Sequence, residues 1–188
     1  MKRSSVLLAA VALLIVWQIV AWLVNRSILP PPLEVLTVFA TEIFGELGLD
    51  FLASLGRVVA SMALAVVTAV PAGLALGQMP SLNRIFSPLI YILYPIPKVV
   101  LVPVILLFLG ISDVAKVVII FLILFFQILV LVRDQAAAIR PELIQSVRSL
   151  GAGRRALFRF VYLPASLPAI LTALRQSVGT AVAVLYIA

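Results

Sequence analysis

The stretch SLGAGRRALFRFVYLPASLP, residues 149–168, places three arginines and a glycine-rich turn between long apolar runs. Hydrophobic residues make up 64% of the 188-residue chain, charged residues 11%, and the mean hydropathy is +1.27. A soluble domain has roughly 25% charged residues. The composition is therefore that of an integral membrane protein, and this basic stretch is expected to be a loop between membrane-spanning helices.

The composition also excludes several classes of chemistry. The chain has no cysteine and no histidine, so disulfides, Cys/His zinc sites and a histidine general base are ruled out. No Gly-x4-Gly-Lys-Ser/Thr motif occurs, and we expect the chain itself to bind no ATP, other cofactor or metal. A net charge of +7 would suggest a nucleic-acid partner for a soluble protein. Membrane topology explains the charge better, and we expect no such partner.

Five apolar segments each approach the roughly 20 residues that a helix needs to cross the hydrocarbon core. They lie at residues 6–24, 52–76, 85–109, 114–132 and 164–188. We interpret residues 1–28 as a retained signal-anchor helix, because the first run lacks a small-residue cleavage site. Residues 29–51 are read as an outer-face connector that contains a short amphipathic helix, or as a simple connector, and residues 52–188 as the membrane-embedded core.

The positive-inside rule orients these spans. With a cytoplasmic N-terminus, the inner segments carry nine of the fourteen basic residues: Lys2, Arg3, Arg84, Arg133, Arg140, Arg148, Arg154, Arg155 and Arg159. The outer segments then carry five of the seven acids: Glu34, Glu42, Glu46, Asp50 and Asp113. We therefore expect a multi-pass membrane protein with its N-terminus in the cytoplasm.

The third span is unusual because it contains four prolines, each of which removes a helical hydrogen bond and kinks the helix. Lys98 lies near its middle, where a charge costs at least about 2.5–3.5 kcal/mol. The lysine could bind an anion, or it could snorkel or pair with another group. Polar residues at a similar depth in neighbouring spans could meet it in one cavity. The candidate pathway residues are Tyr94, Pro97, Lys98, Gln127, Arg175 and Gln176.

The inner loop, residues 133–163, is expected to form two short helices that meet at a glycine. Pro141 opens the first and Gly151 ends it. A second amphipathic segment, RRALFRFVYL, precedes Pro164, where the next span is expected to begin. Such a compact unit is either a docking surface or a solvated basic loop. Elsewhere, Gly73 and Gly77 predict a close helix-packing face.

The spacing of this loop resembles a known family. Gln145-Ser146-Val147, three residues, Gly151, nine residues and Val161-Tyr162-Leu163-Pro164 match the EAA loop of ABC-importer permeases, E-A-A-x3-G-x9-I-x-L-P. The chain departs from this pattern where Gln145 replaces the glutamate and Ser146 and Val147 replace the alanines. The stretches LPPPLEVL, SLGRVVASMALAVVTAVPAGLALG and LPASLPAILTALR are also similar to the nitrate/sulfonate/taurine/bicarbonate-type permeases.

This resemblance implies an all-α, type I ABC importer-like bundle with five spans here and a further C-terminal span beyond residue 188. It also implies a bacterial or archaeal cytoplasmic membrane, a homodimer, a separate ATPase that binds ATP, an extracytoplasmic substrate-binding protein and a non-catalytic role. The residues it assigns to ATPase coupling are Gln145, Ser146, Val147, Gly151, Ala152, Arg154, Arg155, Leu163 and Pro164. The expected cargo is a small anion such as nitrate, a sulfonate or taurine. The alternative cargo is a neutral or cationic metabolite, such as a thiamine precursor or a riboflavin-like molecule.

Three other classes of membrane protein fit the residues less well. A secondary carrier would need ion-relay charges in its spans, and no acid lies inside any predicted span. A membrane scaffold would not need a proline-broken span or a mid-membrane lysine. A membrane enzyme would need paired carboxylates or a nucleophile with its base, and neither pattern occurs.

Overall fold

The computed structural model describes residues 3–187, and every regular element in that range is a helix. Four helices are long and apolar enough to cross a membrane, and a strongly bent pair makes a fifth if it is counted as one span. The predicted all-α membrane bundle with five spans is thus confirmed. Contacts divide the chain into two units, residues 1–53 and 54–188, which are described separately.

The first unit contains α1 (Arg3–Val24) and α2 (Pro32–Glu42). Helix α1 is followed by Asn25 in the left-handed region, at a φ of 43°, which asparagine tolerates better than most residues. The Trp17 indole N–H then donates to the carbonyl of Pro30 at 3.2 Å, which ties α1 to the chain before α2. The short helix expected in the connector is present.

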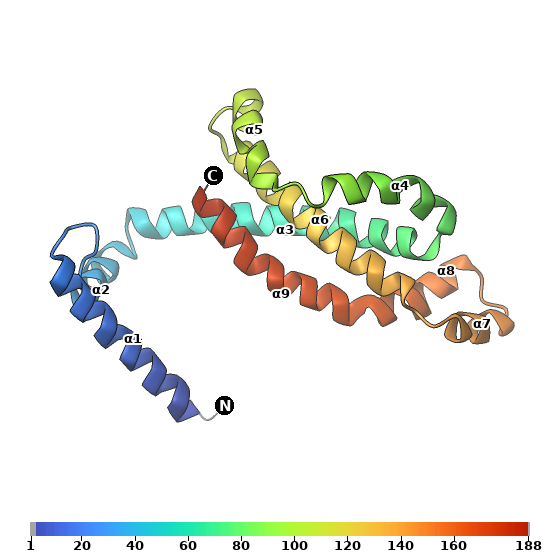
Figure 1. Ribbon diagram of the computed structural model, residues 1–188, viewed down its shortest axis with the longest axis horizontal. Helices are drawn as coiled ribbons and strands as arrows, with labels where there is room; N and C mark the ends of the chain where they lie inside the picture. The colour runs from blue at the N-terminus through green and yellow to red at the C-terminus, as the bar shows by residue number, and fades with distance from the viewer. Residues whose placement is uncertain (1–2, 188) are drawn as a thin grey trace. The chain divides into compact units, whose positions relative to one another are not determined.

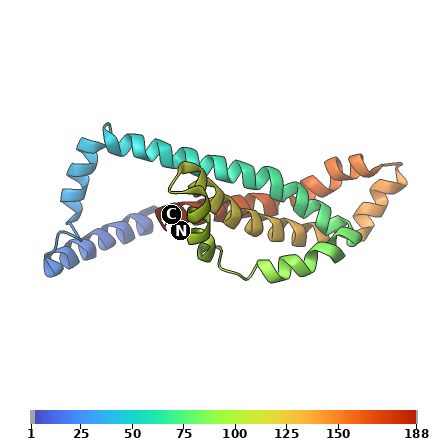
Figure 2. The ribbon, with the colours of Figure 1, turned by 90° about the horizontal axis from the view of Figure 1, so that it is seen from above.

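The second unit is built mainly from three long helices and the shorter ones between them (Figure 1). Its elements are α3 (Glu46–Gln78, which begins in the first unit), α4 (Pro80–Leu93), η1 (a 3-10 helix, Lys98–Leu101), α5 (Val102–Leu109), α6 (Asp113–Ala137), α7 (Pro141–Ser149), α8 (Arg154–Leu157), η2 (a π-helix, Phe158–Tyr162) and α9 (Leu163–Ile187). Helix α6 packs against α9, and the two run side by side in Figures 1 and 2.

The third predicted span is not a single kinked helix. Helix α4 ends at Leu93, and the chain turns by 79° before η1 and α5. Pro95 and Pro97 cause the break, because neither has an N–H to continue the helical hydrogen bonds. Non-helical backbone at membrane depth is tolerated only where it faces protein or a water-filled cavity. The break therefore marks the wall of a cavity.

The inner loop confirms one of its two expected helices and corrects the other. Helix α7 begins at Pro141, and Gly151 follows it in the left-handed conformation at a φ of 83°. The second segment is not separate, because α8, η2 and α9 form one continuous helix from Arg154 to Tyr186. Pro164 lies in its first α-turn after η2 and does not break it. A π-turn shifts the hydrogen-bond pattern just before the proline, where an N–H is missing.

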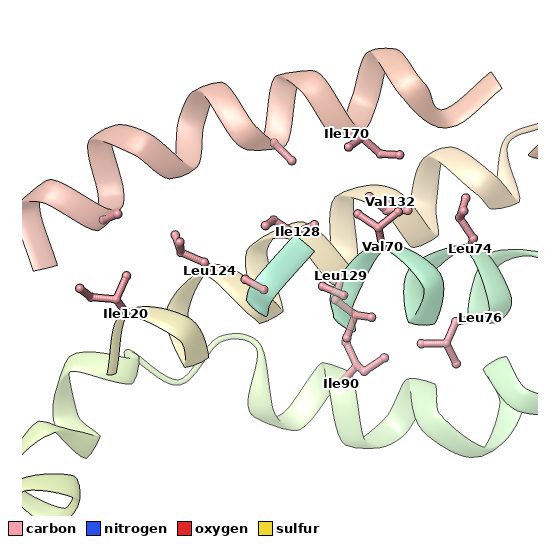
Figure 3. Packing of buried hydrophobic residues seen from close by; sticks show 14 of the residues in the cluster. Val70, Leu74, Leu76, Ile90, Ile120, Leu124, Ile128, Leu129, Val132 and Ile170 are labelled. Carbon is pink, nitrogen blue, oxygen red and sulfur yellow. The ribbon is translucent and has the colours of Figure 1, made fainter. Parts of the chain in front are cut away.

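The core lies around α6. Its buried apolar side chains meet those of α3, α4 and α9, as Figure 3 shows for Leu124, Ile128, Val70, Ile90 and Ile170. Gly73 and Gly77 let the backbones of α3 and α6 approach closely. A Cβ added at Gly77 would lie 2.6 Å from both the Ala136 Cβ and the Arg133 carbonyl oxygen. The predicted small-residue packing face is therefore confirmed, and its partner is α6.

Candidate functional site

A cavity of about 610 Å³ lies between α6, α9 and the break after α4. Its lining residues are Tyr94, Lys98, Ile123, Phe126, Gln127, Val130, Leu131, Asp134 and Gln176. Ligand sites are typically apolar hollows of this size with a few polar groups that fix orientation. This cavity has that character, with two charged residues, two glutamines and a tyrosine among aliphatic and aromatic side chains.

Helix α6 supplies most of the lining because of its periodicity. The lining positions from Ile123 through Gln127 to Asp134 recur every three or four residues and so lie on one helix face. Other positions, such as Leu124 and Ile128, are fully buried against the neighbouring helices. One helix therefore carries a packed face and a cavity-lining face.

Lys98 is held by the broken helix itself. Its ammonium nitrogen lies 2.5 Å from the Leu93 carbonyl oxygen and 2.7 Å from that of Tyr94, and it donates to both. In a continuous helix, the backbone N–H groups of residues 97 and 98 would bond these carbonyls, but residue 97 is a proline and the helix ends there. The lysine replaces those donors. One expectation from the sequence was that Lys98 pairs with another group. The two backbone carbonyls are such partners.

The Lys98 charge also faces aromatic rings in the cavity. Its ammonium lies 4.7 Å from the centre of the Phe126 ring and 5.5 Å from that of Tyr94. An ammonium has three donors, and two of them are used by the carbonyls. The third donor remains available at the cavity wall, so the group can still hold an acceptor.

An ion pair lies near the C-terminal end of α6. The guanidinium of Arg133 is 2.8 Å from Asp134 Oδ1 and stacks on Tyr91 of α4 at 5.4 Å. The Arg133 side chain is buried, whereas that of Asp134 is 60% exposed and reaches the cavity. The cavity therefore has a cationic group near the break and an anionic group two helical turns beyond Gln127 on α6.

The structure brings four of the six predicted pathway residues together. Tyr94, Lys98, Gln127 and Gln176 share the cavity, whereas Pro97 and Arg175 are exposed and do not line it. Pro97 contributes through the break, and Arg175 precedes Gln176 on a different side of α9. Sequence reasoning missed the other five lining residues: Ile123, Phe126, Val130, Leu131 and Asp134. The signal for Asp134 was its position seven residues after Gln127, which puts both on one helix face.

The predicted coupling residues form a second candidate site in the inner loop. Gln145, Ser146 and Val147 lie on α7, Gly151 and Ala152 in the turn, Arg154 and Arg155 on α8, and Leu163 and Pro164 at the start of α9. Helix α7 packs against α8 and η2, so the loop is one folded unit.

This loop presents apolar side chains to its surroundings. The exposed fraction is 85% for Leu150, 68% for Phe160 and 47% for Leu143. A solvated loop would not need large apolar groups beside the turn at Gly151, whereas protein interfaces combine such groups with arginine. Exposed apolar groups and arginines therefore lie together on this loop.

Comparison with known proteins identifies a family. The model of the binding-protein-dependent transport system inner membrane component family matches residues 65–188, which include the cavity and the inner loop.

Individual relatives cover most of the chain. The taurine transport system permease protein of Escherichia coli (strain K12) is 33% identical over 175 residues, 89% of this chain and 64% of that protein. The formylaminopyrimidine transport permease protein of Halalkalibacterium halodurans is 29% identical over 90% of this chain and 68% of its own length. The bicarbonate transport system permease protein of Synechocystis sp. is 28% identical over 89% of this chain and 64% of its own length. The chain thus spans about two thirds of the length of such relatives.

Proposed function

The chain belongs to the family of binding-protein-dependent transport system inner membrane components, and we propose that it is the permease subunit of an ABC importer. It is a non-catalytic, multi-pass protein of the inner membrane. Its partners are a separate ATPase that binds the ATP, an extracytoplasmic binding protein that delivers the cargo, and a second copy of the chain. The observation that carries this proposal is the polar cavity beside a broken helix, which lies in the matched region together with a folded inner loop.

In this mechanism, cargo passes along the cavity-lining face of α6. The loop of residues 133–163 docks into a cleft of the ATPase on the cytoplasmic side, with the N-terminus of the chain on that side too. ATP-driven closure of the ATPase moves the loop as a rigid unit. Because α8 and η2 continue directly into α9, such movement reaches Gln176 in the cavity wall along one continuous helix. ATP binding thereby shifts the equilibrium between two access states.

The proposed cargo is a small anion such as a sulfonate. Lys98 offers a free ammonium donor in the cavity, and the amide groups of Gln127 and Gln176 can donate to an oxyanion as well. Relatives named for taurine and bicarbonate transport agree with this assignment. Taurine itself carries a positive as well as a negative group, which suits a cavity with both Lys98 and Asp134.

The alternative cargo is a neutral or cationic metabolite. Asp134 favours it, because an exposed carboxylate in the cavity would attract a positive or hydrogen-bond-donating group. The relative named for formylaminopyrimidine transport fits this alternative. Transport assays with a sulfonate and with an aminopyrimidine, each with the matching binding protein, distinguish the two cargo classes.

The role of Lys98 can be tested by removing its charge. We expect Lys98→Met to lower sulfonate uptake by the reconstituted importer at least about tenfold, since a hydrogen bond to a charged group contributes about 1.5–3 kcal/mol. Lys98→Arg keeps a charge and is expected to retain most uptake. Lys116→Met removes a lysine outside the cavity and is the matched control. Uptake by Lys98→Met at the wild-type rate, with normal yield, would contradict the anion pathway.

Coupling can be tested with single cysteines, because the native chain has none. We expect Leu150→Cys and Ala152→Cys to crosslink to cysteines in the cleft of the co-expressed ATPase, with a yield that changes when ATP is added. Ile111→Cys is the control. Ile111 is 89% exposed but precedes α6, at the end opposite the loop. Crosslinks that are absent at the loop, or equal at Ile111, would mean that the loop does not couple.

A further inference from the structure

A second cavity, of about 390 Å³, lies between the inner loop and the turn that joins α3 to α4. One wall comes from Gln78 and Ser81, and the other from Arg148, Arg154, Phe158 and Tyr162. Figures 1 and 2 both show α7 and α8 at the same end of the second unit as this turn. The cargo pathway proposed above does not run through this cavity.

The charge of this cavity is uncompensated. Arg148 and Arg154 both line it, and no acidic residue does. The ion pairs found among residues 3–187 join Arg57 to Asp113 and Arg133 to Asp134, so neither cavity arginine takes part in one. Both arginines are exposed, so their guanidinium groups are accessible to an anion. Guanidinium groups bind phosphate in a bidentate geometry, which makes phosphate the favoured anion.

The same cavity also has an apolar side. Phe158 is 41% exposed and Met79 is 42% exposed at its edge, and buried Leu157 forms part of its floor. Tyr162 and Ser81 add hydroxyl groups. Cationic groups beside exposed apolar surface match a molecule with an anionic head and an apolar tail. A free inorganic anion would gain no binding free energy from the apolar side.

We propose that this cavity binds an anionic phospholipid, with the phosphate between Arg148 and Arg154 and an acyl chain against Phe158 and Met79. Basic pockets at the membrane surface bind lipid headgroups in this way. The bound lipid would bridge the inner loop to the ends of α3 and α4, so it would stabilise the loop against the transmembrane core. Lipid binding of this kind does not depend on the transport function proposed above.

The first measurement uses native mass spectrometry of the full chain with phosphatidylglycerol or phosphatidylcholine of identical acyl chains. We expect phosphatidylglycerol to bind at least about tenfold more tightly. Arg148→Gln is expected to weaken phosphatidylglycerol binding about tenfold, so that the preference for this lipid is lost, because a charge-assisted hydrogen bond is removed. Arg148 is a cleaner probe than Arg154, which also belongs to the predicted coupling residues. Arg140→Gln is the matched control, because Arg140 lies on the same loop but does not line this cavity.

Several results would overturn the proposal. Equal binding of the two lipids, or equal loss in Arg148→Gln and Arg140→Gln, would mean that the cavity has no headgroup specificity. Inorganic phosphate that competes as well as a short-chain phosphatidylglycerol would assign the cavity to a free anion. Loss of the lipid when the ATPase binds would mean that this cavity is part of the contact with the ATPase. Arg148→Lys keeps the charge, and its retained preference for phosphatidylglycerol would assign the Arg148→Gln result to the lost charge.

Discussion

The two faces of α6 differ in what they contact and in how they are filled. The packed face meets α3 and α9 through fully buried residues such as Leu124 and Ile128, and through the close approach of Gly73 and Gly77. The other face lines a cavity of about 610 Å³ and carries Gln127. In lipid, apolar side chains gain little from leaving the solvent, so helices associate through close packing and a few polar contacts.

This difference separates stability from transport along a single helix. The packed face should tolerate neither added nor removed atoms, because its neighbours have no room to move or to collapse. The cavity-lining face should tolerate substitution structurally and lose function instead.

The largest effect is expected at Gly77. A valine there would place its Cβ 2.6 Å from the Arg133 carbonyl oxygen, a backbone atom of α6 that cannot turn away. Overpacking costs about 1–3 kcal/mol and occasionally more, and because the clash here is with rigid backbone we expect Gly77→Val to yield little monodisperse protein in size-exclusion chromatography. Gly56→Ala is the control on the same helix, since an added Cβ meets nothing within 4 Å there. Normal behaviour of Gly77→Val would show that α3 and α6 are not closely packed.

A leucine on each face gives the next comparison. Leu124 is fully buried, whereas Leu131 is only partly buried and lines the cavity. Leu124→Ala leaves a void among packed helices, and we expect it to lower the free energy of unfolding by about 2 kcal/mol, the lower end of the range for such changes. Leu131→Ala should cost clearly less. SDS titration followed by circular dichroism measures both, and equal losses would mean that the two faces are packed alike.

The ion pair between α3 and α6 should contribute less. Arg57 donates to Asp113 at 2.8–2.9 Å, but the Asp113 side chain is 73% exposed. Exposed pairs contribute about 0.2–1 kcal/mol. A double-mutant cycle with Arg57→Gln and Asp113→Asn should therefore give a coupling free energy below about 1 kcal/mol. A larger value would mean that this end of α6 contributes as much to stability as its packed middle.

The packed face of α6 was the more predictable from sequence. Hydrophobic runs located the spans, and Gly73 and Gly77 marked a packing face, because these features depend on local composition and helix periodicity. The pairing of Arg57 with Asp113 was not predicted, because it joins residues 56 positions apart. Helix α7 and the turn at Gly151 followed from helix start and stop signals.

The cavity-lining face was predictable only in part. Depth in the membrane grouped Lys98, Gln127 and Gln176, which line one cavity, but depth carries no information about direction, and Arg175 lies outside that cavity. The partners of Lys98 could not be foreseen either. They are backbone carbonyls at the break, where the helical N–H donors of residues 97 and 98 are missing, and sequence reasoning expected a kinked helix in that place.

Two glutamines give the finest test of the contrast. Gln78 donates to the carbonyl of Ala136 and so ties α3 to the packed end of α6, whereas Gln127 lines the cavity. Polar contacts between membrane helices contribute about 0.6 kcal/mol on average. We therefore expect Gln78→Leu to lower the free energy of unfolding by about that amount and Gln127→Leu to leave it unchanged. Gln127→Leu should instead slow cargo uptake several-fold in the reconstituted importer, because the cavity loses an amide that can bind an oxyanion. If Gln127→Leu destabilises the protein as much as Gln78→Leu and leaves uptake intact, then both faces of α6 are structural and the pathway lies elsewhere.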